Sequence, residues 1–138
     1  MDTPPPLDEA ALARLVDRFY AKVRRDPALG PIFEGAVHDW DEHLQLLTDF
    51  WSSVALGTRR FRGNPMAAHR ALPSITTAHF SHWLALWNET TAEELPPAHA
   101  QALRQYAARI GESLQYGLGL DPRRQGRPLG LPVRGGAD

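Results

Sequence analysis

Residues 64–73 have the sequence NPMAAHRALP and predict a short helix that carries a single histidine. Asparagine followed by proline is a common helix start, because asparagine caps the first turn and proline suits the first helical position. A second proline at position 73 ends the segment, so the predicted helix extends from residue 66 to about residue 72. A helix this short is marginal by itself, so we expect something beyond helix propensity to hold it.

Met66, His69 and Leu72 recur at a spacing of three residues and therefore share one face of this helix. A neutral imidazole between two apolar side chains suits a haem iron or another soft metal as a ligand. The alternative is a half-buried histidine bonded to a backbone carbonyl, which is the better expectation for an isolated histidine. The choice between them depends on residues elsewhere in the chain.

Four longer segments have apolar residues at helical spacing and predict helices over about 8–25, 39–56, 77–94 and 98–116. Asp39 with Glu42 three residues later is typical of a helix start, and Gly57 of a helix end. A short turn is expected from Asp26-Pro27 to about residue 33, and Gly117 is expected to cap the last helix. Because no segment alternates convincingly with period two, the predicted fold class is all-α.

The composition indicates one ordinary globular domain. The chain has 138 residues, of which 43% are hydrophobic, as in ordinary globular proteins. Its net charge of −1 gives no indication of nucleic-acid binding. It has no cysteine, no apolar run that predicts a membrane span and no secretory signal, so we expect a cytoplasmic protein. We predict a flexible N-terminal extension over 1–7, the folded domain over 8–116, and a flexible Gly/Pro/Arg-rich tail over 117–138.

Three polar-tipped side chains fall on the apolar faces of three other predicted helices: Tyr20, His43 and Trp83. Each alone is most simply a core residue whose polar atom finds a backbone partner. A buried polar group without a partner costs roughly 1–3 kcal/mol, so such groups need a partner or a cavity. Together with His69 they indicate one shared pocket.

The chain resembles the truncated haemoglobins, and most closely their third group. The matching stretches are Phe19-Tyr20 with Val23, Asp26 and Leu29 to Phe33, His43 with Phe50-Trp51, Gly63-Asn64-Pro65 with His69, and Phe80 with Trp83-Leu84. The resemblance extends over about residues 12–116. The glycine pairs typical of the first two groups are missing, because Gly135-Gly136 falls in the tail.

This resemblance implies a 2-on-2 helical sandwich around a haem b group. His69 is similar to the proximal histidine that ligates the iron. Tyr20 and Trp83 are similar to the distal residues that donate hydrogen bonds to a bound diatomic gas, and His43 to the distal histidine that gates the pocket. The remaining expected contacts with the haem or its distal cavity are Phe33, Leu47, Phe50, Trp51, Met66 and Leu72.

Two further groups of residues have weaker assignments. Arg59, Arg60, Arg62 and Arg70 could pair with haem propionates, although a solvated basic loop is the commoner outcome for any one of them. His38, His79, His82 and His99 are expected at or near the surface. His79 and His82 share a helix, but two histidines alone make a weak metal site.

Two donors on a bound gas would slow oxygen release, which argues against bulk oxygen transport. The sequence therefore favours a reaction of bound O₂ with nitric oxide, or peroxide chemistry, supported by an unidentified reductase. An O₂ or NO sensor or store without turnover would use the same pocket, so enzymatic activity is left open. A haem-free helical interaction module, with His69 and Tyr20 in its core, is the third alternative.

Overall fold

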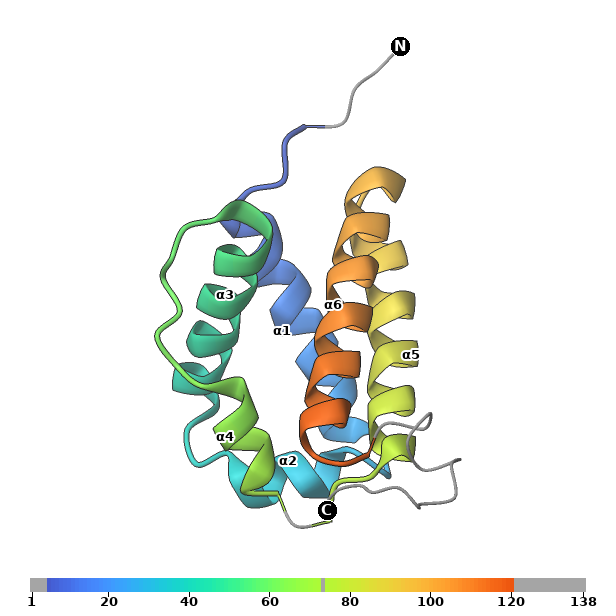
Figure 1. Cartoon of the computed structure of the whole chain (residues 1–138). Coiled ribbons are helices and arrows are strands. Elements are labelled where there is room, and N and C mark those ends of the chain that lie inside the picture. Colours follow the sequence, from blue (N-terminus) through green and yellow to red (C-terminus); the bar gives the residue numbers. More distant parts are fainter. Residues whose placement is uncertain (1–4, 73, 121–138) are drawn as a thin grey trace.

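The computed structural model describes residues 5–72 and 74–120, and within these ranges the chain forms six helices and no strand (Figure 1). The helices are α1 (Glu9–Arg25), α2 (Gly30–Ala36), α3 (Trp40–Leu56), α4 (Pro65–Arg70), α5 (Thr77–Glu94) and α6 (Pro97–Gly117). The predicted all-α class is confirmed. Most of the predicted N-terminal extension and nearly all of the predicted tail lie outside the described residues.

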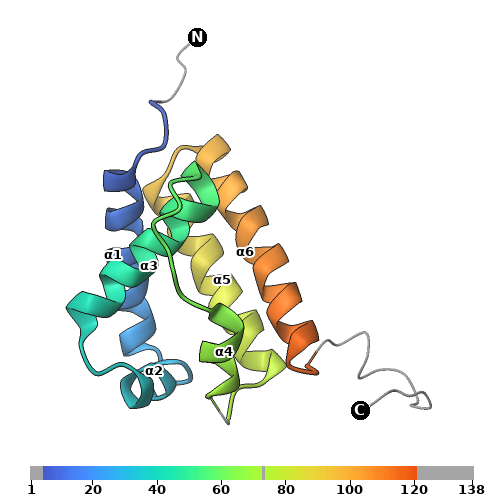
Figure 2. The same cartoon turned by 60° about the vertical axis from the view of Figure 1, so that its left-hand side comes forward.

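The long helices form two packed pairs, α1 with α3 and α5 with α6, and α1 also packs on α5 (Figures 1 and 2). The short helices lie at one end of this arrangement, where α2 contacts α1 and α4 contacts α6. Among the described residues, none of the helices combines the length and apolarity that a bilayer crossing requires.

Local capping sets the ends of α1 and α3. The Asp8 carboxylate accepts from the Ala11 N–H at 2.8 Å, and Asp39 accepts from the Glu42 N–H at 3.2 Å. Each satisfies a backbone donor that the first helical turn leaves free. Gly57 ends α3 with φ +68°, a left-handed conformation that glycine adopts without strain. These boundaries agree with the sequence prediction.

Three predicted boundaries are wrong. The segment after Asp26-Pro27 starts its helix only at Gly30, because the Asp26 carboxylate accepts from the N–H groups of Ala28 and Leu29, both at 2.9 Å, and holds a turn there. The helix then continues to Ala36, beyond the predicted end at residue 33. Gly117 is the last residue of α6 and not its cap.

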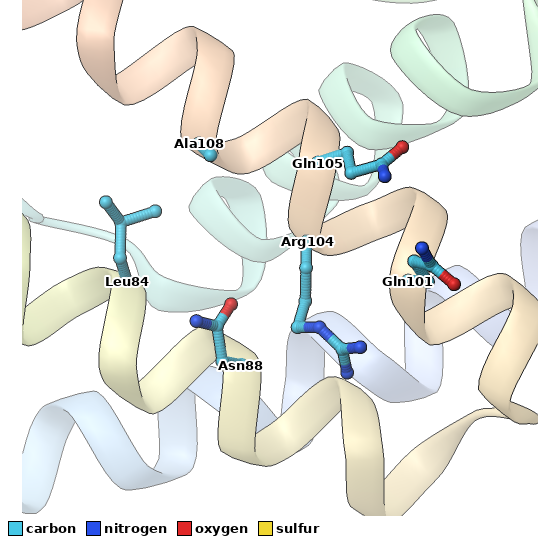
Figure 3. Close-up of a pocket in the computed structure, with 6 residues that line it drawn as sticks. All are labelled: Leu84, Asn88, Gln101, Arg104, Gln105 and Ala108. Carbon is cyan, nitrogen blue, oxygen red and sulfur yellow. The ribbon is translucent and has the colours of Figure 1, made fainter.

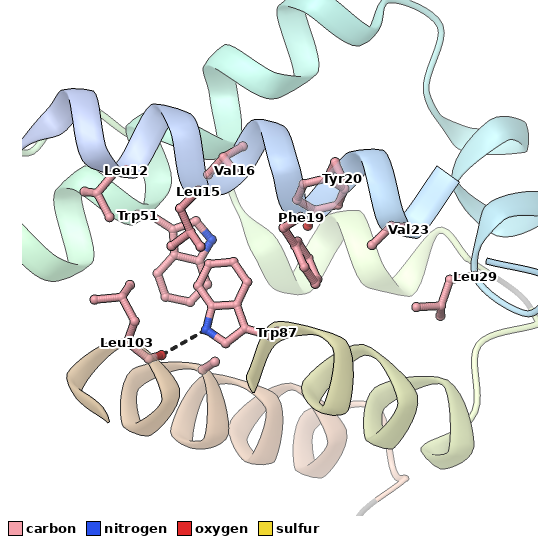
Figure 4. Close-up of a cluster of buried hydrophobic side chains, with 11 residues drawn as sticks. Leu12, Leu15, Val16, Phe19, Tyr20, Val23, Leu29, Trp51, Trp87 and Leu103 are labelled. Atoms are coloured by element: carbon pink, nitrogen blue, oxygen red, sulfur yellow. Dashed lines mark hydrogen bonds between the residues drawn. The ribbon is translucent and has the colours of Figure 1, made fainter. Parts of the chain in front are cut away.

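The core is centred on Trp87, which is completely buried (Figure 4). Its ring stacks on Trp51 of α3 with centroids 4.5 Å apart, and Phe19 of α1 meets it edge-on at 4.9 Å. Its indole N–H donates to the Leu103 carbonyl of α6 at 3.1 Å, so this buried donor has a hydrogen-bond partner. One side chain of α5 therefore joins all four long helices.

Candidate functional site

His69 projects from α4, a helix held at its start by Asn64. The Asn64 side chain accepts from the Ala67 N–H at 3.1 Å, and Pro65 occupies the first helical position. The Nδ1 atom of His69 lies 2.6 Å from the Pro65 carbonyl oxygen, and because a carbonyl oxygen only accepts, Nδ1 is the donor. Nε2 makes no hydrogen bond within the described residues, and its lone pair is free to bind a metal.

One face of α5 connects His69 with the aromatic residues of α1. Phe80 is 7% exposed and lies nearly parallel to the His69 ring, with centroids 5.9 Å apart. Trp83 follows three residues later on the same face and contacts Phe19 at 5.0 Å. Phe80, which contacts His69, and Trp83, which contacts α1, are therefore one helical turn apart on α5.

Tyr20 is buried at the centre of a group of rings that we call the tyrosine cluster: Tyr20, Phe33, Trp40, His43 and Trp83. Tyr20 is 3% exposed. Burial raises its pKa well above the ordinary value, and a hydrogen bond with Trp83 partly opposes that rise. A phenolic hydroxyl can both donate and accept, so Tyr20 places a potential hydrogen-bond donor inside the tyrosine cluster.

His43 is partly buried beside Tyr20. The two rings are nearly perpendicular, with centroids 6.3 Å apart. Burial lowers the pKa of His43 below its ordinary value, since water no longer solvates the charged ring fully. His43 is therefore neutral near pH 7 and offers one donor and one acceptor nitrogen at the edge of the cluster.

Trp40 belongs to the tyrosine cluster but escaped the sequence analysis. Its ring lies 5.6 Å from His43, 6.2 Å from Tyr20 and 6.4 Å from Phe33, measured between centroids. It precedes His43 by three residues, so helical spacing alone placed the two on one face. That signal was available in the sequence.

A cavity of about 400 Å³ opens between α3, α4 and α6. Its apolar lining includes two of the predicted residues, Phe50 and Met66. Arg109, Asn64 and Ser113 add polar groups to the lining, and the sequence analysis did not select Arg109. The cavity thus combines an apolar wall with a cation.

The other predicted residues are not gathered in one place. Leu47 is partly buried and packs against the core, and Leu72 is partly buried directly after α4. Phe33 contacts Tyr20 at 5.5 Å. Trp51 is a core residue, 2% exposed and stacked on Trp87. Arg59, Arg60, Arg62 and Arg70 are all exposed, and Arg60 pairs with Glu9 at 3.0 Å.

The remaining histidines lie at or near the surface, and His79, His82 and His99 have structural partners. His82 Nε2 is 2.6 Å from an Asp26 oxygen and ties α5 to the turn before α2. Burial by itself would raise the pKa of Asp26, but hydrogen bonds from His82 and two backbone N–H groups lower it overall. Nδ1 of His79 accepts from the Thr76 N–H at the start of α5. Within the described residues, no group of three or more His, Asp or Glu side chains could hold a metal ion.

A second hollow, of about 270 Å³, lies between α5 and α6 (Figure 3). Its lining is mostly polar and includes Asn88, Arg104 and Gln105. None of the predicted site residues lines it. The arrangement of His69, the tyrosine cluster and the α3–α4–α6 cavity therefore stands apart from it.

Comparisons with known proteins identify the family of this chain. A family model described as bacterial-like globin matches residues 8–110. A group 3 truncated haemoglobin from Campylobacter jejuni is 35% identical over 88 residues, which cover 61% of this chain and 69% of the relative. The crystal structure of a group III truncated haemoglobin from Campylobacter jejuni matches with a TM-score of 0.78 at 30% identity, covering 89% of this chain and 98% of that one. The chain belongs to the bacterial-like globins, as a truncated haemoglobin of the third group, and is a haem-binding globin.

Proposed function

We propose that this globin binds haem b through Nε2 of His69 and holds a diatomic gas beside the tyrosine cluster. The supporting observation is the face of α5 described above, on which Phe80 contacts His69 and Trp83 contacts α1 one turn later. A haem held between Phe80 and Trp83 would have the His69 ligand on one side and the hydrogen-bond donors of the tyrosine cluster on the other. When bound, the iron supplies the centre that takes up the gas and transfers charge to it.

The donor chemistry of the described residues fits haem. The Nδ1 atom of His69 donates to the Pro65 carbonyl, an orientation that leaves Nε2 for a metal. The cavity between α3, α4 and α6 offers Phe50, Val54 and Met66 as apolar contacts. Arg109 in the same lining suits a carboxylate on the cofactor.

Tyr20 is the residue best suited to act on the bound gas. Its hydroxyl can donate a hydrogen bond, and at 3% exposure it lies in a site shielded from water. A donor in such a site stabilises negative charge on a ligand more than it would in water. Tyr20 would therefore slow the release of oxygen, while neutral His43 stands at the edge of the pocket.

Slow release favours a reaction of the bound gas over transport. Oxidation of nitric oxide to nitrate takes both oxygen atoms of O₂ and one electron, and a one-electron reductase must return that electron after each turnover. Peroxide activation in the same pocket is the second candidate, since a buried donor also polarises an O–O bond. Both use Tyr20 as the donor and His69 as the anchor.

Absorbance spectra of the purified protein, oxidised and reduced, test the haem assignment. We expect a strong Soret band in the wild type and loss of the five-coordinate, histidine-ligated ferrous spectrum in His69→Ala. His38→Ala is the matched control, because His38 is exposed and outside the site. An unaltered spectrum in His69→Ala would show that another residue ligates the iron, and His43 would be the next residue to replace.

The reaction is tested by mixing the oxygenated ferrous protein with nitric oxide and measuring nitrate. Stoichiometric nitrate, formed faster than oxygen dissociates, supports the dioxygenase assignment. Absence of nitrate together with normal gas binding would instead assign the protein as a sensor or store.

A further inference from the structure

Trp40 is in contact with three helices although it is the first residue of α3. It meets Tyr20 of α1 at 6.2 Å, Phe33 of α2 at 6.4 Å and His43 of α3 at 5.6 Å. Its plane is at 90° to the His43 ring, a favourable arrangement for two aromatic groups. No other aromatic ring among the described residues contacts His43 more closely.

Arg24 fixes Trp40 from the solvent side of the cluster. The guanidinium carbon lies 4.4 Å from the centre of the indole, a cation–π contact. The same guanidinium pairs through Nε with Glu34 of α2 at 3.2 Å. Arg24 is thus held at two points, and the Trp40 ring has a defined position between it and the cluster.

The indole N–H of Trp40 is buried and has no hydrogen-bond partner within the described residues. The contacts that the structure shows for Trp40 are therefore contacts of its ring. The flat ring is what contacts Tyr20, Phe33 and His43. A phenylalanine would keep most of that contact and remove the unpaired donor.

We infer that Trp40 is a positioning residue that holds His43 at the entrance of the gas-binding pocket, and that Arg24 keeps Trp40 in place. The inference rests on the proposed function, in which His43 stands at that entrance. The fraction of molecules with His43 displaced then sets how fast a gas enters, because only those molecules admit it.

Flash photolysis of the carbon monoxide complex measures that entry rate directly. We expect Trp40→Leu to raise the CO association rate by about two- to tenfold, the range that loss of one aromatic contact supports. Trp40→Phe should leave the rate unchanged. In a His43→Leu background, Trp40→Leu should have no further effect, because the residue it positions is gone.

Arg24→Gln is a second variant, at an exposed position where folding is not at risk. It should raise the CO association rate in the same direction as Trp40→Leu. Arg18→Gln is the matched control, since Arg18 also lies on α1 and pairs through Nε with a glutamate, Glu94 at 3.3 Å, but touches no ring of the cluster. It should not change the rate.

Proton NMR of the diamagnetic CO complex supplies a readout independent of kinetics. The ring resonances of His43 should shift in Trp40→Leu and return towards wild-type values in Trp40→Phe. Unchanged CO association in Trp40→Leu, or an equal rise in the His43→Leu background, would overturn the inference. Either result requires a protein that binds haem and CO, so it leaves the proposed function intact, whereas a wild type without a Soret band refutes that function itself.

Discussion

Replacing Tyr20 by phenylalanine removes one hydroxyl from a position that is 3% exposed and leaves the ring contacts with Phe19 and Phe33 in place. In the proposed function, the lost hydroxyl proton is the one that Tyr20 donates to a bound gas. Hydrogen bonds to charged acceptors contribute about 1.5–3 kcal/mol. At 1.4 kcal/mol for each factor of ten, oxygen should dissociate about ten to 150 times faster from Tyr20→Phe.

The assay is stopped-flow displacement of oxygen by carbon monoxide from the ferrous protein. Tyr106→Phe is the control, because Tyr106 packs partly buried against the core from α6, outside the tyrosine cluster. Trp83→Phe should also speed dissociation, and the double variant should show less than the sum of the two effects because both residues belong to one network. An unchanged oxygen dissociation rate in Tyr20→Phe with a normal Soret band would refute the hydrogen-bonding argument.

Two further predictions concern stability, each measured by urea unfolding of the haem-loaded protein. Gly30→Ala should lower the free energy of unfolding by about 1–3 kcal/mol, because a Cβ there would lie 2.8 Å from the Arg24 carbonyl oxygen. Gly35→Ala on the same helix, with nothing within 4 Å, should be neutral or stabilising, and equal losses would show that steric contact is not the cause. Burial lowers the pKa of His43, so the unfolded chain binds the extra proton first as the pH falls. Stability should therefore be full above about pH 6.5 and decline as the pH falls through the folded-state pKa. His43→Leu should flatten that decline, and an equal decline in the variant would assign it to other groups.

Capping chemistry explains why some helix ends were predictable and others were not. Asp39 and Gly57 act on their own neighbours, so the bounds of α3 follow from sequence alone. The start of α2 depends on Asp26, whose side chain can cap a helix or hold a turn. Its link to His82, 56 residues away, favours the turn, and no local pattern reveals a contact of that separation.

The candidate site likewise has features that the sequence predicts and features that only the packing of the helices determines. His69, Tyr20, His43 and Trp83 were found because each combines a polar atom with an apolar helical face. The edge-on contact between Phe19 and Trp83 was not predicted, since it depends on how α1 packs on α5. Trp51 was predicted as a site residue because it lies on the apolar face of α3. The structure stacks it on Trp87 in the core.

The helix α4 has six residues, and none of them is buried. No residue of α4 belongs to the hydrophobic core around Trp87, so unfolding of α4 would leave the contacts of that core in place. In the proposed function, where His69 ligates the haem iron, loading of the cofactor and ordering of α4 would be one coupled event. Cofactor retention would depend on the local stability of this one helix and much less on the melting temperature of the whole protein.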